Sequence, residues 1–423
     1  MTPTLDSPFA KIANHFEPRA LEGEALKEFF VGDFFEPFMQ ALISAIDTSD
    51  SYQKLLLIGH RGCGKTTLLN KVAEELRTRY HLVYFSAGEV LNMMDVETVD
   101  ILLATYIKVI ESADTLKLEK RGEKEDKTSK ELLQEKLLSP FRKLMPSSQI
   151  KRFEKIDIKV LETFSFRFTV EPETRAEIRN ALWNQVDDLQ NNLSDACADV
   201  REETGKDVLI IIDNLDKLED AMAQNVFLKG SRLLTLPRAK VLFTMPLPTF
   251  YNPGFIGVSD VDYRPVFIPL IALSDRDGNP RPDNLDEMEQ VVLRRIDDKL
   301  VDKAALQAMI LASGGLLRDL IKFMHMACTR AIVKGKMEGR DVIIDEDIAA
   351  LVIRDLVNQY TRVFDFPKYH DSATHIRNDK DKEQVAHEDM SFFLNNLFAL
   401  EYGHPDRIWY DLHPCLARAL DKQ

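Results

Sequence analysis

The amino-acid sequence predicts an α/β fold built on a parallel sheet, and two features of the chain carry this prediction. Apolar runs with the length of buried strands occur at residues 55–58, 81–87, 207–213, 239–248 and 262–273. Apolar residues at helical spacing separate several of these runs, as at residues 68–76, 96–110 and 178–200. Strands that alternate with helices are typical of a parallel sheet whose faces are covered by helices.

Length and composition are those of an ordinary soluble protein. The 423 residues are 45% hydrophobic and 29% charged, which suffices for two or three domains with full cores. The N-terminal stretch MTPTLDSPFA lacks the pattern of a secretory signal, and no apolar run approaches the roughly 20 residues that span a bilayer. We therefore expect a cytoplasmic protein with no membrane partner.

Charge and cysteine content disfavour further classes. A formal net charge of −14 argues against a protein that coats nucleic acid with a broad basic surface, so DNA is a possible but not a favoured partner. The four cysteines lie far apart in the sequence, which favours reduced thiols over a disulfide framework or a zinc knuckle: Cys63, Cys197, Cys328 and Cys415.

The most specific motif is KLLLIGHRGCGKTTLL at residues 54–69, where an apolar strand leads into a glycine-rich loop and then a helix. It fits the spacing G-x-x-x-x-G-K-[ST], in which backbone N–H groups surround phosphate oxygens. Lys65 is expected to reach the β- and γ-phosphates and Thr66 to hold Mg²⁺, while the helix N-terminus favours the anion. The predicted ATP- and ADP-binding residues are Gly59, His60, Arg61, Gly62, Cys63, Gly64, Lys65, Thr66 and Thr67.

A second motif, DVLIIIDNLDKL at residues 207–218, is an apolar strand that ends at Asp213. Ligands of parallel sheets bind outside the carboxyl ends of the strands, so this carboxylate is expected to face the nucleotide. Together with the glycine-rich loop it predicts a Walker B acid that holds Mg²⁺ beside Thr66, directly or through water. The alternative is a strand that merely ends in an Asp-Asn turn.

Asn214 follows the predicted metal ligand, at a position where many ATPases of this layout have glutamate. An amide cannot accept a proton as a carboxylate does, so we expect slow hydrolysis unless Asp216 acts as the base. Slow turnover favours a switch that dwells in the ATP state over a continuously cycling motor.

Other polar residues near predicted strand ends are candidates for contact with the γ-phosphate. Thr244 is expected either to sense that phosphate or orient water, or to bond its hydroxyl to the backbone. Three arginines are candidates for a finger that reaches a neighbouring subunit's nucleotide, with ordinary surface cations as the alternative: Arg232, Arg238 and Arg264.

Three further segments have recognisable patterns. Residues 9–47 are helical and rich in phenylalanine, which predicts core packing. A second interpretation, compatible with the first, is that the stretch around Phe30 and Val31 closes over an adenine ring. Residues 113–165 mix both signs of charge, which predicts a solvated helical protrusion or a partly disordered insertion. A capping-box pattern at residues 174–177 predicts the start of one long amphipathic helix that runs to residue 200.

The order of these motifs resembles the AAA+ ATPase family, particularly its origin-recognition branch and the related bacterial STAND-like ATPases. The stretch ASGGLLRDLIKFM at residues 312–324 resembles the sensor 2 helix of that family. The resemblance spans roughly residues 25–360 and implies a P-loop NTPase sheet with a helical lid, in which Arg318 contacts the γ-phosphate. The missing glutamate after Asp213 and the charged insertion depart from the family pattern.

The C-terminal part resembles a small winged-helix domain. Residues 365–383 suggest a polar linker, and residues 390–420 predict a helix, a two-stranded hairpin and a second helix. Leu400 and Tyr402 are expected to pair with residues 408–410. Few basic side chains are available here to contact base edges, so protein contact is favoured over DNA contact. The histidines and Cys415 match no zinc spacing.

We expect an N-terminal helical segment at 1–50, a P-loop ATPase α/β domain at 51–275, a helical lid at 276–363 and a winged-helix-like domain at 364–423. The expected catalytic residues are Asp213, Asn214, Asp216, Thr244 and Arg318. The resemblance implies a slowly hydrolysing regulatory ATPase that uses ATP and Mg²⁺ to switch self-assembly or a separate effector protein, as in bacterial antiphage defence. The alternatives are a DNA-loading or transposition-regulating ATPase that oligomerises on duplex DNA, and a nucleotide-bound scaffold that hydrolyses nothing.

Overall fold

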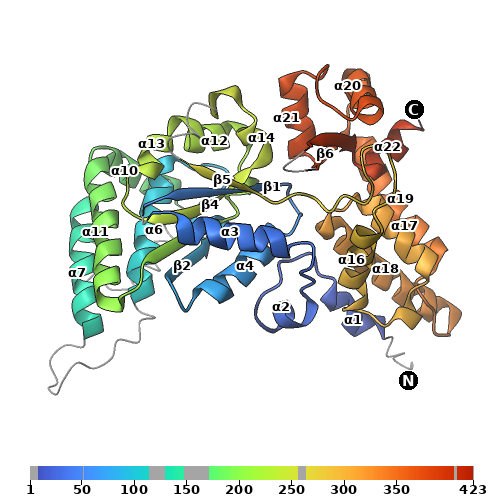
Figure 1. Cartoon of the computed structure of the whole chain (residues 1–423), viewed down its shortest axis with the longest axis horizontal. Coiled ribbons are helices and arrows are strands. Elements are labelled where there is room, and N and C mark those ends of the chain that lie inside the picture. The colour runs from blue at the N-terminus through green and yellow to red at the C-terminus, as the bar shows by residue number, and fades with distance from the viewer. Residues whose placement is uncertain are drawn as a thin grey trace. The chain divides into compact units, whose positions relative to one another are not determined.

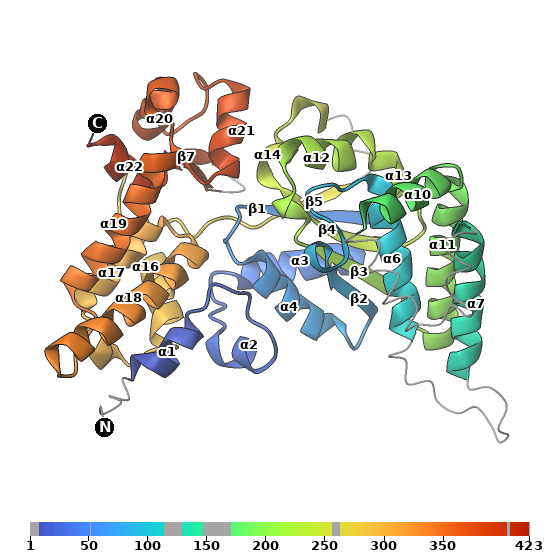
Figure 2. The same cartoon turned by 180° about the vertical axis from the view of Figure 1, so that it is seen from behind.

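The computed structural model describes residues 8–50, 52–113, 129–146, 171–255, 263–403 and 407–422. The chain forms two compact units (Figures 1 and 2). We call residues 41–58 and 72–266 the sheet unit, and residues 1–40, 59–71 and 267–423 the helical unit. The glycine-rich loop thus groups with the N-terminal and C-terminal helices. Each unit is described by itself.

The sheet unit is built on a five-stranded sheet with the order β2-β3-β4-β1-β5. The strands are β1 (Lys54–Gly59), β2 (His81–Ser86), β3 (Val208–Asp213), β4 (Lys240–Pro246) and β5 (Arg264–Phe267). β3 pairs in parallel with both β2 and β4, and Ser86 lies opposite Asp213 in this register. All residues of β1, β3 and β4 are buried, as expected for strands covered on both faces.

The first four predicted strands are confirmed to within about two residues at each end. The fifth prediction, at residues 262–273, is wrong in length because β5 covers only Arg264–Phe267. Pro269 has no N–H to donate to a neighbouring strand, which opposes its continuation. Residues 247 and 248, also predicted as strand, belong to the short helix after β4.

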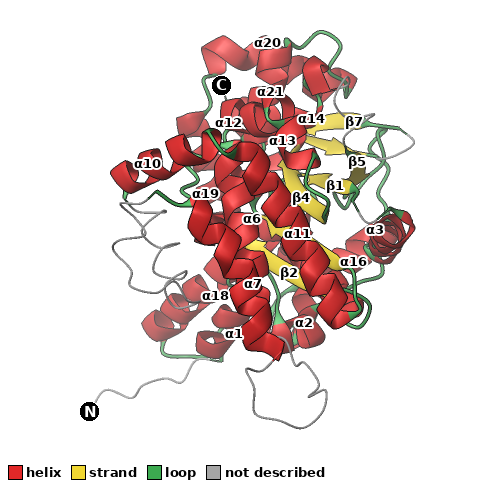
Figure 3. Cartoon of the chain, turned by 90° about the vertical axis from the view of Figure 1, so that its left-hand side faces the viewer, coloured by secondary structure: helices red, strands yellow, loops and turns green. Residues whose placement is uncertain are grey.

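Helices surround this sheet, as Figure 3 shows with helices in red and strands in yellow. They are α3 (Glu36–Thr48), α4 (Lys65–Leu76), α5 (Ala87–Val90), α6 (Thr98–Ser112), α7 (Ser129–Leu144), α10 (Pro172–Trp183), α11 (Val186–Thr204), η2 (Leu215–Lys217), α12 (Asp220–Gln224), η3 (Asn225–Lys229), α13 (Ser231–Thr235) and α14 (Leu247–Phe250). The first residues of α3 and α4 belong to the helical unit. α11 packs against both α6 and α7 (Figure 1).

The single long helix predicted before β3 is wrong. The structure has two helices, α10 and α11, which are separated at Asn184 and Gln185. The predicted capping box is also wrong, because α10 begins at Pro172, whose fixed φ suits the first turn of a helix. Thr174 therefore lies inside the helix and donates its hydroxyl hydrogen to the Glu171 carboxylate at 2.8 Å.

A buried ion cluster joins α10 to α6. The Arg179 guanidinium donates to both carboxylate oxygens of Asp100, at 2.9 and 2.5 Å, and to Asp95 at 3.0 Å. Asp100 belongs to the capping box of α6 and is 1% exposed. Burial raises the pKa of the Asp100 carboxyl, and the Arg179 hydrogen bonds only partly oppose that shift. The cluster therefore holds a costly buried carboxylate next to its cation.

Residues 114–128 and 147–170, which include most of the charged insertion, lie outside the described part of the chain. The helix between them, α7, packs against α6 and α11 rather than standing in solvent. Leu137 and Phe141 are buried, and the Leu137 carbonyl accepts a hydrogen bond of 3.1 Å from the Tyr106 hydroxyl. Lys136 forms an ion pair of 2.6 Å with Asp199 of α11.

The helical unit gathers segments from three parts of the sequence. Its elements are α1 (Phe9–His15), α2 (Gly23–Phe29), α16 (Pro282–Leu293), η4 (Asp298–Leu300), α17 (Lys303–Ser313), α18 (Leu317–Glu338), α19 (Glu346–Val363), α20 (Phe366–Asp379), α21 (His387–Asn395), β6 (Ala399–Tyr402), β7 (Trp409–Leu412) and α22 (Pro414–Leu420). α1 packs along α18, where the Ala13 carbonyl lies 3.0 Å from Nδ1 of His325. Phe9, Phe16 and Phe29 are buried, which supports the core-packing alternative for the N-terminal aromatic residues.

The C-terminal part departs from the prediction in two respects. The predicted linker at residues 365–383 is wrong, because it contains α20, whose first turn is capped by the Asp365 carboxylate. An aromatic cluster joins α19, α20, α21 and the start of β6 into one core: Tyr360, Phe364, Phe366, Tyr369, Phe392, Phe393 and Phe398. The predicted hairpin is confirmed as antiparallel β6 and β7, and Tyr402 lies opposite Trp409 as expected. The expected partner of Leu400 is wrong, because Leu400 lies opposite Asp411, outside residues 408–410. Residues 404–406 of its turn lie outside the described part.

Candidate nucleotide-binding site

Two glycines shape the loop between β1 and α4. Gly62 has φ +86° and Gly64 has φ +104°, which side chains with a Cβ rarely adopt. A Cβ on Gly62 would lie 2.8 Å from Cβ of Arg318, and one on Gly64 would lie 3.1 Å from Cδ1 of Leu317. The loop therefore closes tightly against the first turn of α18, and it needs glycine at both positions.

Lys65 places a cation inside this loop. Its side chain is 5% exposed, and its ammonium group donates to the carbonyl oxygens of Gly59 and His60 at 2.9 Å each. Lys65 is also the first residue of α4, whose N-terminal end carries positive partial charge. Cation, helix end and glycine backbone together form an anion site of the kind that holds phosphate groups.

The N-terminal segment is hydrogen-bonded to the first turns of α4 through Leu21, a residue that no sequence motif predicts. The amide of Leu21 donates to the Thr67 hydroxyl at 3.1 Å, and its carbonyl accepts from Asn70 at 2.8 Å. Thr67, predicted as a nucleotide ligand, thus holds Leu21. Thr66, one residue earlier, is half-buried. No sequence pattern marks Leu21, since both of its bonds use the backbone.

The stretch around Phe30 and Val31 is attached to α16. The Phe30 carbonyl accepts from Arg294 at 2.6 Å, and the Phe34 amide donates to the Glu287 carboxylate at 3.2 Å. Burial raises the pKa of Glu287, with the Phe34 hydrogen bond opposing the shift. Val31 is buried. Closure of this stretch over an adenine ring stays a prediction.

Arg318, for which the resemblance implies contact with the γ-phosphate, lies against the loop; that contact stays a prediction. Its amide donates to the Gly62 carbonyl at 3.1 Å, and Nε of its side chain would lie 3.0 Å from a Cβ on Gly62. The side chain is 42% exposed, and Nε is 3.7 Å from the Asp319 carboxylate. Gly314 and Gly315, both with positive φ, turn the chain from α17 into this helix.

His60 joins the loop to the C-terminal hairpin. Its Nε2 atom accepts a hydrogen bond of 2.7 Å from the amide of Glu401 in β6. Because Nε2 accepts, the neutral ring carries its proton on Nδ1, which is buried and has no hydrogen-bond partner among the described residues. Burial, and secondly the Lys65 charge, lower the pKa of His60 to about 3, so the ring is neutral at physiological pH. A buried donor without an acceptor costs roughly 1–3 kcal/mol.

The hairpin also contacts the turn before α18. His413 is fully buried, accepts from the Cys415 amide on Nδ1 at 3.2 Å, and has Nε2 3.2 Å from the Asp319 carboxylate. Burial alone would raise the pKa of Asp319, but the His413 hydrogen bond and nearby Arg318 lower it overall. The Tyr402 hydroxyl donates to the Gly314 carbonyl at 2.8 Å. Sequence spacing gave no signal for these contacts, because they join residues about 90 positions apart.

In the sheet unit, polar side chains gather at the carboxyl ends of β2 and β3 and beside β4. Asp213 ends β3, is 2% exposed and accepts from the Asn214 amide at 2.6 Å. Asn214 has φ +66°, and its side-chain amide donates to the Ser86 hydroxyl at 2.8 Å. Thr244 is fully buried and accepts from the Asp216 amide at 3.4 Å. All of these residues except Ser86 are expected from the sequence, and the polar end of β2 could have indicated Ser86.

Thr244 lies inside β4, not at its end, and its hydroxyl bonds to backbone as the plainer alternative expected. Arg264 caps the end of α3: its Nη1 donates to the Ala45 carbonyl at 3.3 Å and to the Thr48 hydroxyl at 3.2 Å. Arg232 and Arg238 are exposed.

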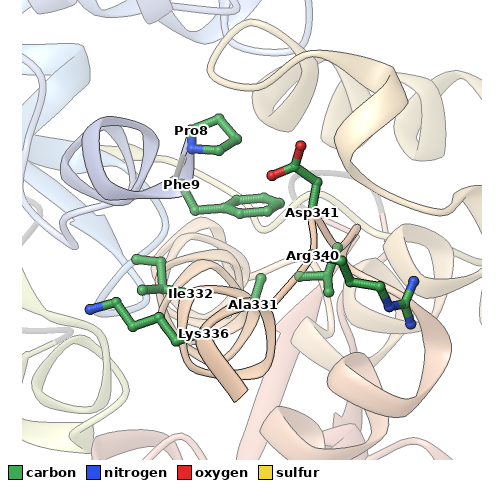
Figure 4. A pocket seen from close by; sticks show the side chains of 9 residues that line it. Pro8, Phe9, Ala331, Ile332, Lys336, Arg340 and Asp341 are labelled. Atoms are coloured by element: carbon green, nitrogen blue, oxygen red, sulfur yellow. The ribbon is translucent and has the colours of Figure 1, made fainter. Parts of the chain in front are cut away.

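The remaining features of the described residues point to no second site. No group of three or more metal-binding side chains occurs among them, and none of their helices is long and apolar enough to cross a membrane. A small pocket with room for about one water molecule lies between α1 and the end of α18 (Figure 4). Phe9, Ala331 and Ile332 line it, while Lys336 and Arg340 stand at its edge. It contains no residue of the phosphate loop.

Comparison with known protein families shows which family the segment that contains the loop resembles. Residues 36–241, which include the loop and Asp213, match the family described as AAA ATPase domain. This segment, just under half of the chain, is similar to that family. The chain therefore carries a nucleotide-binding ATPase fold, as its sheet and loop indicate.

Solved structures with a similar trace include Cdc6p from Pyrobaculum aerophilum, at 11% identity and a TM-score of 0.38, covering 97% of this chain and 98% of that one. The RuvB Holliday junction branch migration motor of Thermotoga maritima has 12% identity and a TM-score of 0.40, with 96% and 98% covered. The Drosophila ORC bound to DNA has 8% identity and a TM-score of 0.42, with 100% and 93% covered. No curated protein matches the sequence.

Proposed function

We propose that the AAA ATPase domain of this protein is a slow nucleotide switch, in which ATP in the loop at residues 59–66 sets the position of α18 and of the C-terminal helices. The observation that carries the proposal is the contact of Arg318 with Gly62, through the backbone at 3.1 Å and through the side chain. Whatever fills the loop changes the surface on which the first turn of α18 lies. A change in the nucleotide that occupies the loop then changes the position of α18.

The residues present fit ATP and Mg²⁺. Gly62 and Gly64 have the positive φ angles with which a loop turns its backbone N–H groups toward an anion, and Lys65 supplies the cation for the β- and γ-phosphates. Thr66 and Asp213 each offer a hard oxygen ligand, and the Asn214 amide fixes the orientation of the Asp213 carboxylate. Bound Mg²⁺ would neutralise charge on the phosphate oxygens.

Slow hydrolysis follows from Asn214. Its side-chain amide is held by Ser86 and cannot accept a proton from water. Asp216 is the first acid after Asn214 in the sequence, is 5% exposed, and is our candidate base. A long-lived ATP state suits control of self-assembly or of a separate effector protein.

We also propose a winged-helix role for α21, β6, β7 and α22, with protein rather than DNA as its partner, because the net charge is −14. The domain boundaries given in the sequence analysis, a cytoplasmic location and a role in antiphage defence belong to the same proposal. The last of these rests on family analogy alone.

Light scattering after gel filtration tests the switch on the full chain with ATP, with ADP and without nucleotide. Lys65→Ala should abolish nucleotide binding and fix one assembly state, while Lys71→Ala, on the same helix, should behave as the wild type. If wild type and Lys65→Ala have the same mass in all three conditions, the switch is refuted. Salt-sensitive retention on duplex DNA would instead favour the DNA-loading alternative.

A further inference from the structure

We propose that His60 is the positioning residue that transmits occupancy of the phosphate loop to the C-terminal hairpin. This inference rests on the proposed function, since it needs a nucleotide in the loop. It assigns the transmission to one side chain, which has one end in the loop and the other on β6.

The hairpin end of this link is a single buried hydrogen bond at the edge of β6 that does not pair with β7. The Glu401 amide does not pair with β7 but donates to Nε2 of His60 at 2.7 Å. The opposite edge of the hairpin is closed separately, because the Tyr410 amide donates to the Lys380 carbonyl at 3.0 Å. At each edge of the hairpin, one backbone amide therefore donates to a group outside the hairpin. Of these two amides, only that of Glu401 contacts the loop.

At the loop end of the link, the His60 carbonyl and a bound phosphate compete for the ammonium group of Lys65. Lys65 holds the His60 carbonyl at 2.9 Å with the ammonium group that a phosphate would attract. When Lys65 turns to an anion, the backbone of His60 loses this bond. The buried Nδ1–H has no acceptor among the described residues. An arrangement of the ring in which this N–H found an acceptor would therefore be more stable. A loop that changes around phosphate can thus move the ring and release Glu401.

The hairpin is positioned to pass this change to the sensor helix. His413, just after β7, contacts Asp319 at 3.2 Å, and the Tyr402 hydroxyl holds the Gly314 carbonyl at 2.8 Å. Asp319 follows Arg318, which lies on Gly62 of the same loop. The hairpin therefore contacts the loop through His60 and the start of α18 through His413, and a shift at one contact acts on the other.

Amide hydrogen exchange of the full chain tests the proposal, read at Glu401 and Tyr410 without nucleotide, with ATP and Mg²⁺, and with ADP and Mg²⁺. In the wild type, ATP should speed exchange at Glu401 by about tenfold and change Tyr410 less than about twofold. His60→Gln keeps an acceptor where Nε2 lies and should preserve protection at Glu401. His60→Asn lacks that reach and should exchange quickly at Glu401 in all three conditions.

Isothermal titration of ATP into the same samples separates the possible failures. If ATP binds and exchange at Glu401 does not change, the inference is refuted while the proposed function stands. If no ATP binds, both are refuted. Equal acceleration at Glu401 and Tyr410 would mean that the whole hairpin opens, which also contradicts a link through His60. Should His60→Asn not fold, the wild type and His60→Gln still decide.

Discussion

The amide of Arg318 donates to the carbonyl oxygen of Gly62 at 3.1 Å, so the first turn of α18 is bound to the phosphate loop by its backbone. The Arg318 side chain is held less firmly than its backbone. It is 42% exposed, and its contact with Asp319 is 3.7 Å long, so this ion pair contributes little stability. The guanidinium can therefore exchange Asp319 for a phosphate oxygen at small cost, while the backbone bond keeps it beside the loop.

Gly62→Ala should weaken nucleotide binding by at least about tenfold and destabilise the protein. The substitution adds a Cβ at φ +86°, which costs roughly 1–2 kcal/mol, and places it 2.8 Å from Cβ of Arg318. Either the loop or α18 must then move. Titration calorimetry with ATP and urea unfolding measure the two effects.

Gly278→Ala is the matched control for this substitution. Gly278 has φ +88°, but a Cβ there would meet nothing within 4 Å. It should show the backbone cost alone and bind ATP as the wild type does. Equal ATP affinities in the two variants would contradict a tight fit between the loop and α18.

His60 should make stability depend on pH. Its pKa is about 3 in the folded protein and 6.5 ordinarily, so the unfolded chain binds this proton more readily than the folded one. The neutral His60 ring makes its full contribution to the free energy of unfolding above pH 6.5, and this contribution is lost as the pH falls from 6.5 toward 3. Between pH 7.5 and pH 5 the loss amounts to about 2 kcal/mol.

Urea unfolding of the wild type and His60→Gln at several pH values measures this loss. Other titrating groups are common to both proteins, so the difference between the two curves isolates His60. The wild type should lose about 2 kcal/mol more than His60→Gln over that interval. Parallel curves would mean that the ring is not buried as a neutral group.

How much of this site the sequence predicts depends on the range of the contacts involved. The loop, Lys65 and Asp213 follow from spacing and from the ends of apolar strands, because one local backbone conformation serves one chemistry. Arg318 followed from a resemblance in one helix start. The contacts of His60 with Glu401, and of Asp319 with His413, join residues that no local pattern relates.

The same distinction explains the errors in the fold. The predicted linker contains many charged residues, yet Phe366, Tyr369 and Ile376 recur at helical spacing and bury one face of α20. Composition concealed the periodicity there. The break between α10 and α11 escaped notice for the opposite reason: the apolar spacing continues from Leu182 to Val186 although the helical backbone is interrupted between them.

Asn214→Ala should destabilise the protein by roughly 1–2 kcal/mol, whereas Asn214→Gly should cost less. Asn214 has φ +66°, a conformation that asparagine and glycine adopt most easily. Both substitutions remove the hydrogen bond to Ser86, so their difference reports the backbone alone. Urea unfolding compares them, with Ser86→Ala to measure the hydrogen bond. Equal stabilities would contradict the left-handed backbone at this position.

Arg179→Met should destabilise the sheet unit by roughly 3–5 kcal/mol, because it leaves the Asp100 carboxylate buried without its cation. Arg142→Met is the matched control: it breaks an exposed pair with Glu135 on α7 and should cost less than about 0.5 kcal/mol. Adding Asp100→Asn to Arg179→Met removes the stranded charge while an amide oxygen still accepts from the Glu97 backbone. The double variant should therefore recover at least half of the loss in urea unfolding. If Arg179→Met costs no more than Arg142→Met, the cluster between α10 and α6 contributes nothing to stability, and apolar packing alone holds α10 in place.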